Sequence, residues 1–164
     1  ESMAKSKDKT NNSPRIVNRK ARHDYNVLEK IECGIELQGS EVKSVRMSRV
    51  SIGEGFARVE PKTMELFLYD VDIAAYPNAP VTAHEPKRRR KLLAHRGEIE
   101  RLYGQTTSKG TTLIPLAMYF NSRGIAKVEL GVAEGKRSHD KRESMKKKEA
   151  DKAIRRAMTR KRIG

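Results

Sequence analysis

The chain has 164 residues, a formal net charge of +15 and a pI of about 10.1, an excess that predicts a polyanionic partner: nucleic acid or an acidic membrane surface. No apolar stretch approaches the roughly 20 residues that span a bilayer, and the polar first dozen residues show no signal peptide, so we expect a cytoplasmic protein. Cys33 is the only cysteine, which excludes an internal disulfide framework and a cysteine-based zinc ribbon. Its apolar neighbours Ile31 and Ile35 indicate a small core residue.

The positive charge is concentrated at the ends of the chain. Residues 135–164 carry 13 basic and 4 acidic side chains, a net of +9, whereas residues 25–134 carry 16 and 14, a net of +2. A nearly neutral middle is typical of a folded domain. We therefore expect a disordered N-terminal arm over 1–17, a folded domain over 18–134 and a basic tail over 135–164.

The first half of this domain has the patterns of strands and one short helix. Apolar and polar residues alternate over 25–37, which predicts a half-buried strand that Gly39 ends. Ser40 is expected to cap a short helix, with Glu41 in its first turn and Val42 and Val45 facing inward. A second β region follows over 51–59 and 64–73, with a turn at 61–63.

The second half begins with an irregular loop, predicted over 76–86 from its three prolines. Residues 87–103 are predicted to be helical, with Leu92, Ile99 and Tyr103 on one stripe and Gly104 as the C-terminal stop. Two strands over 111–120 and 125–133 should form a hairpin around the turn at 121–124. Six or so short strands with two or three short flanking helices predict a mostly β fold, a small antiparallel barrel of the oligonucleotide-binding type.

Two basic segments of the domain are candidates for RNA contact. Residues 18–25 combine three cations with an amide, an imidazole and an aromatic ring, groups that bind phosphates and unpaired bases. The alternative is a basic lead-in whose Tyr25 packs into the barrel. Residues 87–91 are five consecutive cations at the start of the expected helix, so some must face the body, which is costly unless RNA or nearby acids are present. A nuclear-localisation signal is the competing interpretation.

The third basic segment is the tail. Its weak apolar stripe predicts a helix that buries little, so we expect it to be disordered when free and helical when bound to its partner. The stripe consists of Ala150, Ala153, Ile154, Ala157 and Met158. Because it lacks Trp, Phe and Leu, RNA is the better partner than a membrane surface.

The sequence gives little support for catalysis. The four histidines, His23, His84, His95 and His139, have no metal-ligand spacing, and there is no phosphate-binding glycine loop. We therefore expect no enzyme activity, no metal and no cofactor. Two other functions stay open at this point: an RNA-processing enzyme built on His84, Glu85 and His95, and a general ribosome-associated protein or RNA chaperone.

Six segments, in order along the chain, together resemble one bacterial family: residues 18–25, 32–44, 90–95, 110–116, 127–133 and 135–142. They read NRKARHDY, ECGIELQGSEVKS, RKLLAH, GTTLIPL, KVELGVA and GKRSHDKR. The family is small protein B, SmpB, the SsrA or transfer-messenger RNA-binding proteins. The resemblance runs from about residue 18 to the C-terminus.

The resemblance implies an oligonucleotide-binding-type barrel and a role in trans-translation, the rescue of stalled ribosomes. It implies that the barrel grips the tRNA-like part of transfer-messenger RNA. The tail would enter the vacant decoding site and mRNA path, against small-subunit rRNA. Elongation factor Tu is the further partner expected in the delivery complex, and the protein is expected to be a monomer that binds no membrane.

The resemblance also assigns residues. On or supporting the transfer-messenger RNA face would be Asn18, Arg19, Lys20, Arg22, Tyr25, Glu32, Glu41, Lys43, Lys91, Leu92 and His95. In the tail, the decoding-site residues would be Gly135, Lys136, His139, Asp140, Lys141 and Arg142, with His139 stacking on an rRNA base. Glu32 and Glu41 would orient cations or accept from base amines. The loop at 74–84 departs from the family pattern, being short and having Ala83 where an Asn commonly precedes His84, so no RNA contact is expected from it.

Overall fold

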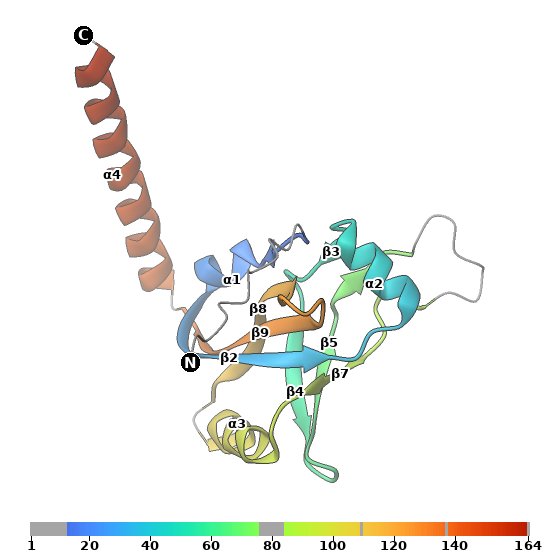
Figure 1. The fold of residues 1–164 in the computed structure, drawn as a ribbon. Helices are drawn as coiled ribbons and strands as arrows, with labels where there is room; N and C mark the ends of the chain where they lie inside the picture. The colour runs from blue at the N-terminus through green and yellow to red at the C-terminus, as the bar shows by residue number, and fades with distance from the viewer. Residues whose placement is uncertain (1–12, 76–83, 109, 137, 164) are drawn as a thin grey trace, which may run out of the picture.

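The fold is given by a computed structural model that describes residues 13–75, 84–108, 110–136 and 138–163. Six strands close into an antiparallel barrel, which confirms the predicted fold class (Figure 1). In chain order they are β2 (Tyr25–Ile35), β4 (Phe56–Glu60), β5 (Glu65–Tyr69), β7 (Arg90–Leu93), β8 (Thr112–Phe120) and β9 (Ala126–Gly135). Round the barrel the order is β8, β4, β5, β7, β2 and β9, and the β8–β9 pairing closes the ring.

Three short strands lie outside this ring. Strand β1 (Ile16–Val17) pairs with β8, although both of its residues belong to the expected N-terminal arm. Residues 1–12 of that arm lie outside the described residues. Strands β3 (Val50–Ser51) and β6 (Asp72–Ile73) form a separate two-stranded sheet. The predicted β regions at 51–59 and 64–73 are thus each divided between this small sheet and the barrel.

The strongest local patterns are confirmed. Strand β2 has its alternation interrupted at Leu28, where the register with β9 shifts and Leu28 stays exposed. The β8–β9 turn is held by Asn121, whose Oδ1 accepts from the backbone N–H of Arg123 (3.0 Å) and of Ile125 (2.9 Å). Gly124 in this turn has φ +76°, a value that favours glycine. Buried side chains from every strand of the ring fill the barrel, among them Cys33, as expected.

The helices show three differences from the predictions. Helix α2 (Gly39–Arg46) begins before Ser40, because Gln38 is its N-cap and Glu41 closes a capping box with it. Helix α1 (Arg19–Asp24) was not predicted. The helix predicted over 87–103 is wrong in its first half, since residues 90–93 form β7, and α3 (Arg96–Ser108) continues past Gly104.

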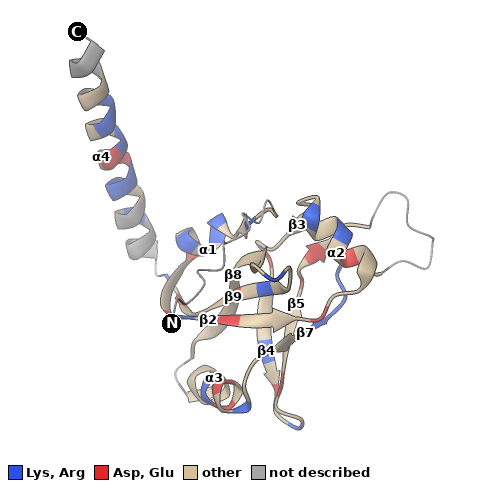
Figure 2. Cartoon of the chain, viewed as in Figure 1, with Lys and Arg blue, Asp and Glu red and all other residues tan. Residues whose placement is uncertain are grey.

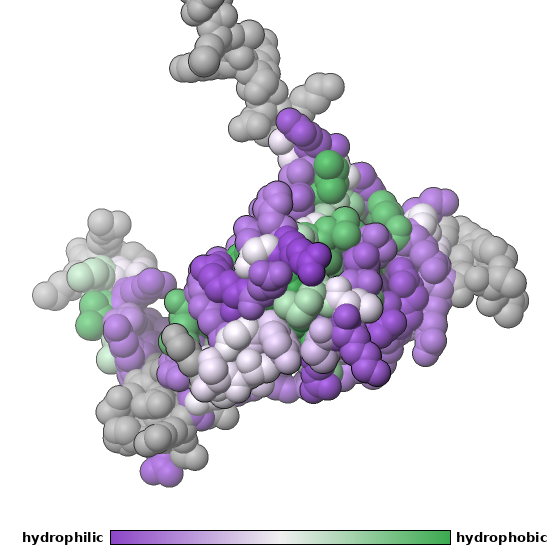
Figure 3. All heavy atoms as spheres, turned by 90° about the horizontal axis from the view of Figure 1, so that it is seen from below, coloured by the Kyte–Doolittle hydropathy of each residue, from purple (hydrophilic) through white to green (hydrophobic). Residues whose placement is uncertain are grey.

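The helices lie at opposite ends of the barrel (Figure 1). Helices α1 and α2 lie at one end and α3 covers the other, while α4 (Ser138–Ile163) projects from the barrel and carries the C-terminus. Seen from the α3 end, small hydrophobic areas lie among hydrophilic residues (Figure 3). None of the helices in the described part of the chain has the apolar length that crossing a bilayer requires. The irregular loop predicted over 76–86 lies mostly outside the described residues.

Candidate nucleic-acid interface

Three of the residues assigned to the RNA face are buried and can act only by supporting it. Asn18 is 5% exposed, Glu41 0% and Leu92 1%. Leu92 packs in the barrel core. The Oδ1 atom of Asn18 caps α1 by accepting from the N–H of Ala21 (3.1 Å), and its Nδ2 donates to the carbonyl oxygen of Pro115 (2.8 Å). The amide of Asn18 is therefore committed to holding α1 against β8.

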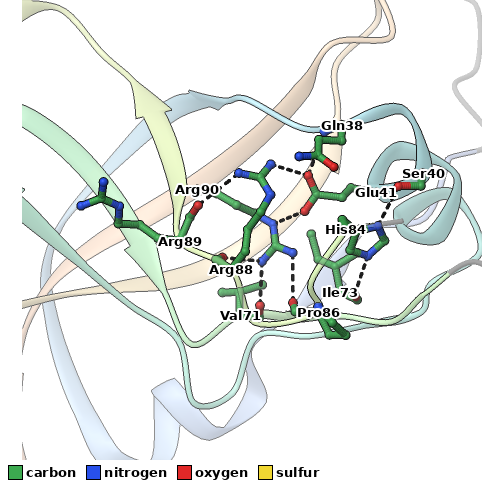
Figure 4. A network of polar contacts seen from close by, with 10 residues as sticks. All are labelled: Gln38, Ser40, Glu41, Val71, Ile73, His84, Pro86, Arg88, Arg89 and Arg90. Carbon is green, nitrogen blue, oxygen red and sulfur yellow. Dashed lines mark hydrogen bonds and ion pairs between the residues drawn. The ribbon is translucent and has the colours of Figure 1, made fainter. Parts of the chain in front are cut away.

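Glu41 is the centre of a buried ion-pair network (Figure 4). Its Oε1 accepts from the backbone N–H of Gln38 (2.8 Å) and from Arg88 (2.5 Å), and its Oε2 accepts from Nε of Arg90. Burial alone would raise the pKa of this carboxyl, but the hydrogen bonds from Gln38, Arg88 and Arg90 outweigh burial and lower it. Glu41 thus orients neighbouring cations, one of the two roles expected for it.

The same network explains the run of cations at 87–91. Arg90 is fully buried and, besides Glu41, donates to the carbonyl oxygens of Val71 (2.8 Å) and Pro86 (3.0 Å). Arg89, one position earlier, is exposed and points away from the network (Figure 4). Cations that face the body need a nearby acid, and that acid is Glu41, which neutralises Arg88 and Arg90. The segment runs from a turn into the first residues of β7, so it is not helical and its side chains do not project all round.

His84 is held inside the protein. Its Nε2 lies 2.9 Å from the carbonyl oxygen of Ile73 and its Nδ1 lies 2.7 Å from the hydroxyl of Ser40 (Figure 4). Since a carbonyl oxygen only accepts, Nε2 carries a proton, and in the neutral ring Nδ1 accepts from Ser40. Both ring nitrogens are therefore used, and they tie the start of the segment at residues 84–89 to α2 and to β6. The described residues contain no group of three His, Cys, Asp or Glu side chains placed to hold a metal.

A cleft of about 360 Å³ opens on the outer side of β2, β7 and β9, next to the start of α3. Gly34 pairs with both Leu93 and Lys127, so these two side chains flank a position that has none. The remaining lining residues are Glu32, Ala94, His95 and Glu98. The cleft brings together Glu32 and His95 from the sequence assignment. It adds Leu93, 47% exposed, and Lys127, which the sequence reasoning missed.

Glu32 is oriented by Tyr119, whose hydroxyl donates to its Oε2. Burial and this hydrogen bond raise the pKa of Tyr119 to about 12, so the hydroxyl keeps its proton and stays a donor. The guanidinium of Arg15 lies over the ring of Tyr119, 4.6 Å from its centroid. The sequence did not indicate that Tyr119 is the partner of Glu32. The cleft therefore offers a fixed carboxylate, an ammonium group, an imidazole and an apolar side chain in one place.

The other assigned residues lie elsewhere on the surface. Arg19, Lys20 and Arg22 are exposed on α1 and Lys43 on α2, at the end of the barrel opposite α3. Tyr25 is half-buried and packs against a small cluster that α1, β8 and β9 form outside the barrel core, so its ring is not part of the barrel interior. Lys91 faces Glu65, with 3.7 Å between Nζ and Oε2. The candidate residues thus occupy two ends of one barrel.

The tail leaves the barrel at Gly135, which ends β9 opposite Tyr25. The backbone N–H of Lys136 then donates to the carbonyl oxygen of Asp24 (2.9 Å). Helix α4 follows, with Lys and Arg along much of its described length (Figure 2). Arg142 is exposed, whereas the side chains of His139, Asp140 and Lys141 lie outside the described part of the chain.

Comparison with known proteins decides the family. The family model described as SmpB protein matches residues 15–160, which include both the barrel and most of α4. The chain belongs to the SmpB family. The SsrA-binding protein of Carboxydothermus hydrogenoformans is 52% identical over 141 residues, which cover 86% of this chain and 93% of that protein. The SsrA-binding protein of Levilactobacillus brevis is 50% identical over 157 residues, with 95% and 98% covered.

A solved structure shares the SmpB fold. It is described as "tmRNA-SmpB: a journey to the center of the bacterial ribosome", and it matches with a TM-score of 0.65 at 47% sequence identity. The match covers 81% of this chain and 95% of the other. The resemblance found in the sequence and the barrel found in the structure therefore lead to the same SmpB family.

Proposed function

We propose that the chain binds the tRNA-like part of transfer-messenger RNA and delivers it to stalled ribosomes for trans-translation. The observation that carries the proposal is the 47% identical structural match to a protein described as tmRNA-SmpB in the bacterial ribosome. The relatives named SsrA-binding protein match most of the chain, and their name supports binding of the same RNA. A ribosomal partner implies a cytoplasmic protein.

The barrel is the part that holds transfer-messenger RNA. The cleft at Glu32, Leu93, His95 and Lys127 supports this, because a cation, a fixed acceptor and an apolar contact are the groups that recognise unpaired bases and phosphates. Exposed cations on α1 and Lys43 on α2 add phosphate contacts at the other end. Asn18, Glu41 and Leu92 hold the elements that carry these contacts.

The tail is the part that enters the ribosome. Helix α4 projects from the barrel and carries cations along its length, as expected for a segment inside an RNA-lined channel (Figure 2). We propose that residues 135–142 occupy the vacant decoding site and that elongation factor Tu accompanies the complex. The chain acts as a monomer and without catalysis. The buried ring of His84, with both nitrogens bonded, supports the absence of a His84-based nuclease.

Removing the tail tests this division of roles. The chain is cut after Lys136, because β9 ends at Gly135 and Lys136 still bonds to Asp24. We expect the truncated protein to bind a transcript of the tRNA-like domain within about twofold of the full chain, because the proposed contacts with this RNA all lie on the barrel. A twofold change corresponds to under about 0.5 kcal/mol of binding free energy. Peptide tagging on stalled ribosomes in a reconstituted translation system should be lost.

Two outcomes would contradict the proposal. Loss of transcript binding on truncation would show that the barrel is not the transfer-messenger RNA site. Equal affinity for an unrelated structured RNA of the same length would favour a general RNA chaperone. An RNA-processing enzyme would instead cleave labelled RNA at sub-stoichiometric protein, with the activity lost in His84→Ala.

A further inference from the structure

Three aromatic rings lie on the outside of the barrel, where the core does not use them. Residues of β4 and β5 alternate between buried and partly exposed positions, and Phe56, Phe67 and Tyr69 occupy outward positions. Phe56 and Tyr69 are cross-strand partners, and their rings stack with centroids 5.3 Å apart and an interplanar angle of 16°. Phe67 lies two residues before Tyr69 on the same face.

Phe67 is surrounded by cations. Its cross-strand neighbours are Arg58 on β4 and Lys91 on β7. The guanidinium of Arg89 lies over its ring, 4.0 Å from the centroid, on the side away from the Glu41 network (Figure 4). Lys91 is balanced by Glu65. Arg58 and Arg89 are exposed, and among the described residues neither has an acid within ion-pair distance.

Sheet stability accounts for only part of this arrangement. A stacked cross-strand pair such as Phe56–Tyr69 stabilises a hairpin on its own. It does not require unpaired guanidinium groups beside it, since like charges gathered on one surface repel each other. Partly exposed rings interleaved with cations are what single-stranded or looped RNA binds, with bases stacked on the rings and phosphates on the cations. An acidic protein partner would use the cations and leave the rings unexplained.

The same face continues into the cleft described above. Lys91 and Leu93 are both outward residues of β7, and a second hollow lined by Glu65, Lys91, Leu93 and Ala94 adjoins the cleft that Leu93 and Ala94 share with Lys127. The rings therefore extend a surface that already has the groups for RNA contact, across the neighbouring strands β5 and β4.

We propose that Phe56, Phe67 and Tyr69, together with Arg58, Arg89 and Lys91, form an aromatic platform that stacks unpaired nucleotides of the RNA held in the cleft. The proposal rests on the proposed function and adds to it a second contact region on the outer side of β4, β5 and β7. The rings supply stacking that tolerates any base, and the two arginines, which have no acidic partner among the described residues, contact the flanking phosphates.

Tryptophan fluorescence tests the stacking. The chain contains no Trp, so Phe67→Trp introduces a single fluorophore at the platform. Titration with a transcript of the tRNA-like domain should quench this emission, because a stacked base lies against the indole. The control is Ile125→Trp, at an exposed position on the β8–β9 turn, where the same titration should leave the emission nearly unchanged.

Charge reversal tests the arginines. Arg58→Glu and Arg89→Glu should each weaken transcript binding by about tenfold and lower the slope of log affinity against log salt by about 1. Arg123→Glu, an exposed cation on the β8–β9 turn, makes the same charge change away from the platform and should have under about a twofold effect. The melting temperature of each variant is measured alongside. If a reversal lowers it, Arg58→Gln or Arg89→Gln replaces that variant in the same assay.

The outcomes separate the two proposals. If the wild-type chain binds the transcript while the emission of the Phe67→Trp variant stays unquenched and the charge reversals match Arg123→Glu, the platform is overturned and the proposed function stands. If the wild-type chain does not bind the transcript, the proposed function fails and the platform fails with it. Quenching together with a selective loss in Arg58→Glu and Arg89→Glu supports both.

Discussion

The ammonium group of Lys136 donates to the carbonyl oxygen of Arg22, 3.0 Å away, across 114 positions of sequence. Arg22 belongs to the last turn of α1, where carbonyl oxygens lack helical partners and favour a nearby cation. The first residue after β9 is thus fixed to the helix that displays Arg19 and Lys20. We therefore expect the direction in which the tail leaves the barrel to depend on this contact.

Replacing Lys136 should loosen the tail without unfolding the barrel. Lys136→Met keeps the apolar stem and removes the charge, so we expect a loss of at most about 1 kcal/mol of stability and a broader range of tail orientations. Spin labels are attached to the cysteines of a Lys62→Cys, Ile154→Cys double variant, and pulsed electron paramagnetic resonance measures the distribution of distances between them. Lys148→Met, an exposed cation within α4, is the control. Identical distance distributions in the two variants would show that Lys136 does not set the direction.

Glu41→Gln should be strongly destabilising. The amide keeps the shape of the side chain but leaves the buried guanidinium of Arg90 without its counter-charge, which costs about 3–5 kcal/mol. Urea unfolding followed by circular dichroism measures the change. Glu100→Gln breaks the exposed pair with Arg96 on α3 and should cost under about 0.5 kcal/mol. A similar small cost for both variants would mean that Arg90 finds water or another acceptor.

The lowered pKa of Glu41 also predicts how stability depends on pH. In the unfolded chain this carboxyl titrates near about 4.3, whereas in the folded protein its hydrogen bonds keep it ionised at lower pH. Between these two pKa values the unfolded state binds more protons. The contribution of Glu41 is therefore complete above about pH 4.3 and is lost as the pH falls through the native pKa.

The measurement is the free energy of unfolding in urea at a series of pH values across this range. The wild-type chain should lose more stability on acidification than Glu41→Gln does. Glu100→Gln removes an exposed carboxyl instead, and this variant should follow the wild-type curve. Parallel curves for the wild type and Glu41→Gln would assign the acid sensitivity to other carboxyls.

Cys33 should react with thiol reagents only when the barrel opens. It is 1% exposed, and burial raises the pKa of its thiol to about 12, so the reactive thiolate is scarce in the native state. Ellman's reagent should modify the native protein at the rate of unfolding and the urea-unfolded protein at once. Ser108→Cys, at the exposed end of α3, provides a thiol that reacts immediately. Rapid native modification of Cys33 would contradict a closed barrel.

The parts of the fold that were predictable are those set by neighbours in sequence. Strand β2 follows a simple alternation, and the β8–β9 hairpin is specified by the turn residues around Asn121 and Gly124. The helix predicted for residues 87–95 was wrong because the decisive partners are distant in sequence. Strand β7 pairs with β5 and β2, and Arg90 bonds to Glu41, 49 positions earlier. Helix α1 was missed because its signal is one Asn, which the sequence reasoning had assigned to RNA.

The candidate site divides in the same way. Glu32 and His95 came from short motifs, whereas Leu93 and Lys127 join them only through the pairing of two different strands with Gly34. No local pattern shows that three strands meet there. Phe67 and Arg89 likewise come together across β5 and the residues before β7, so the platform could be found only in the folded chain.

The length of α4 has a mechanical consequence. Its 26 residues extend about 39 Å at 1.5 Å per residue, and the contacts described between tail and barrel lie at its base. A rotation of about 10° at that joint would displace the far end by roughly 7 Å, about the length of two nucleotides along a strand. The length of α4 thus sets how far the tail reaches, and a small change at the Lys136 contacts would be enough to redirect its far end.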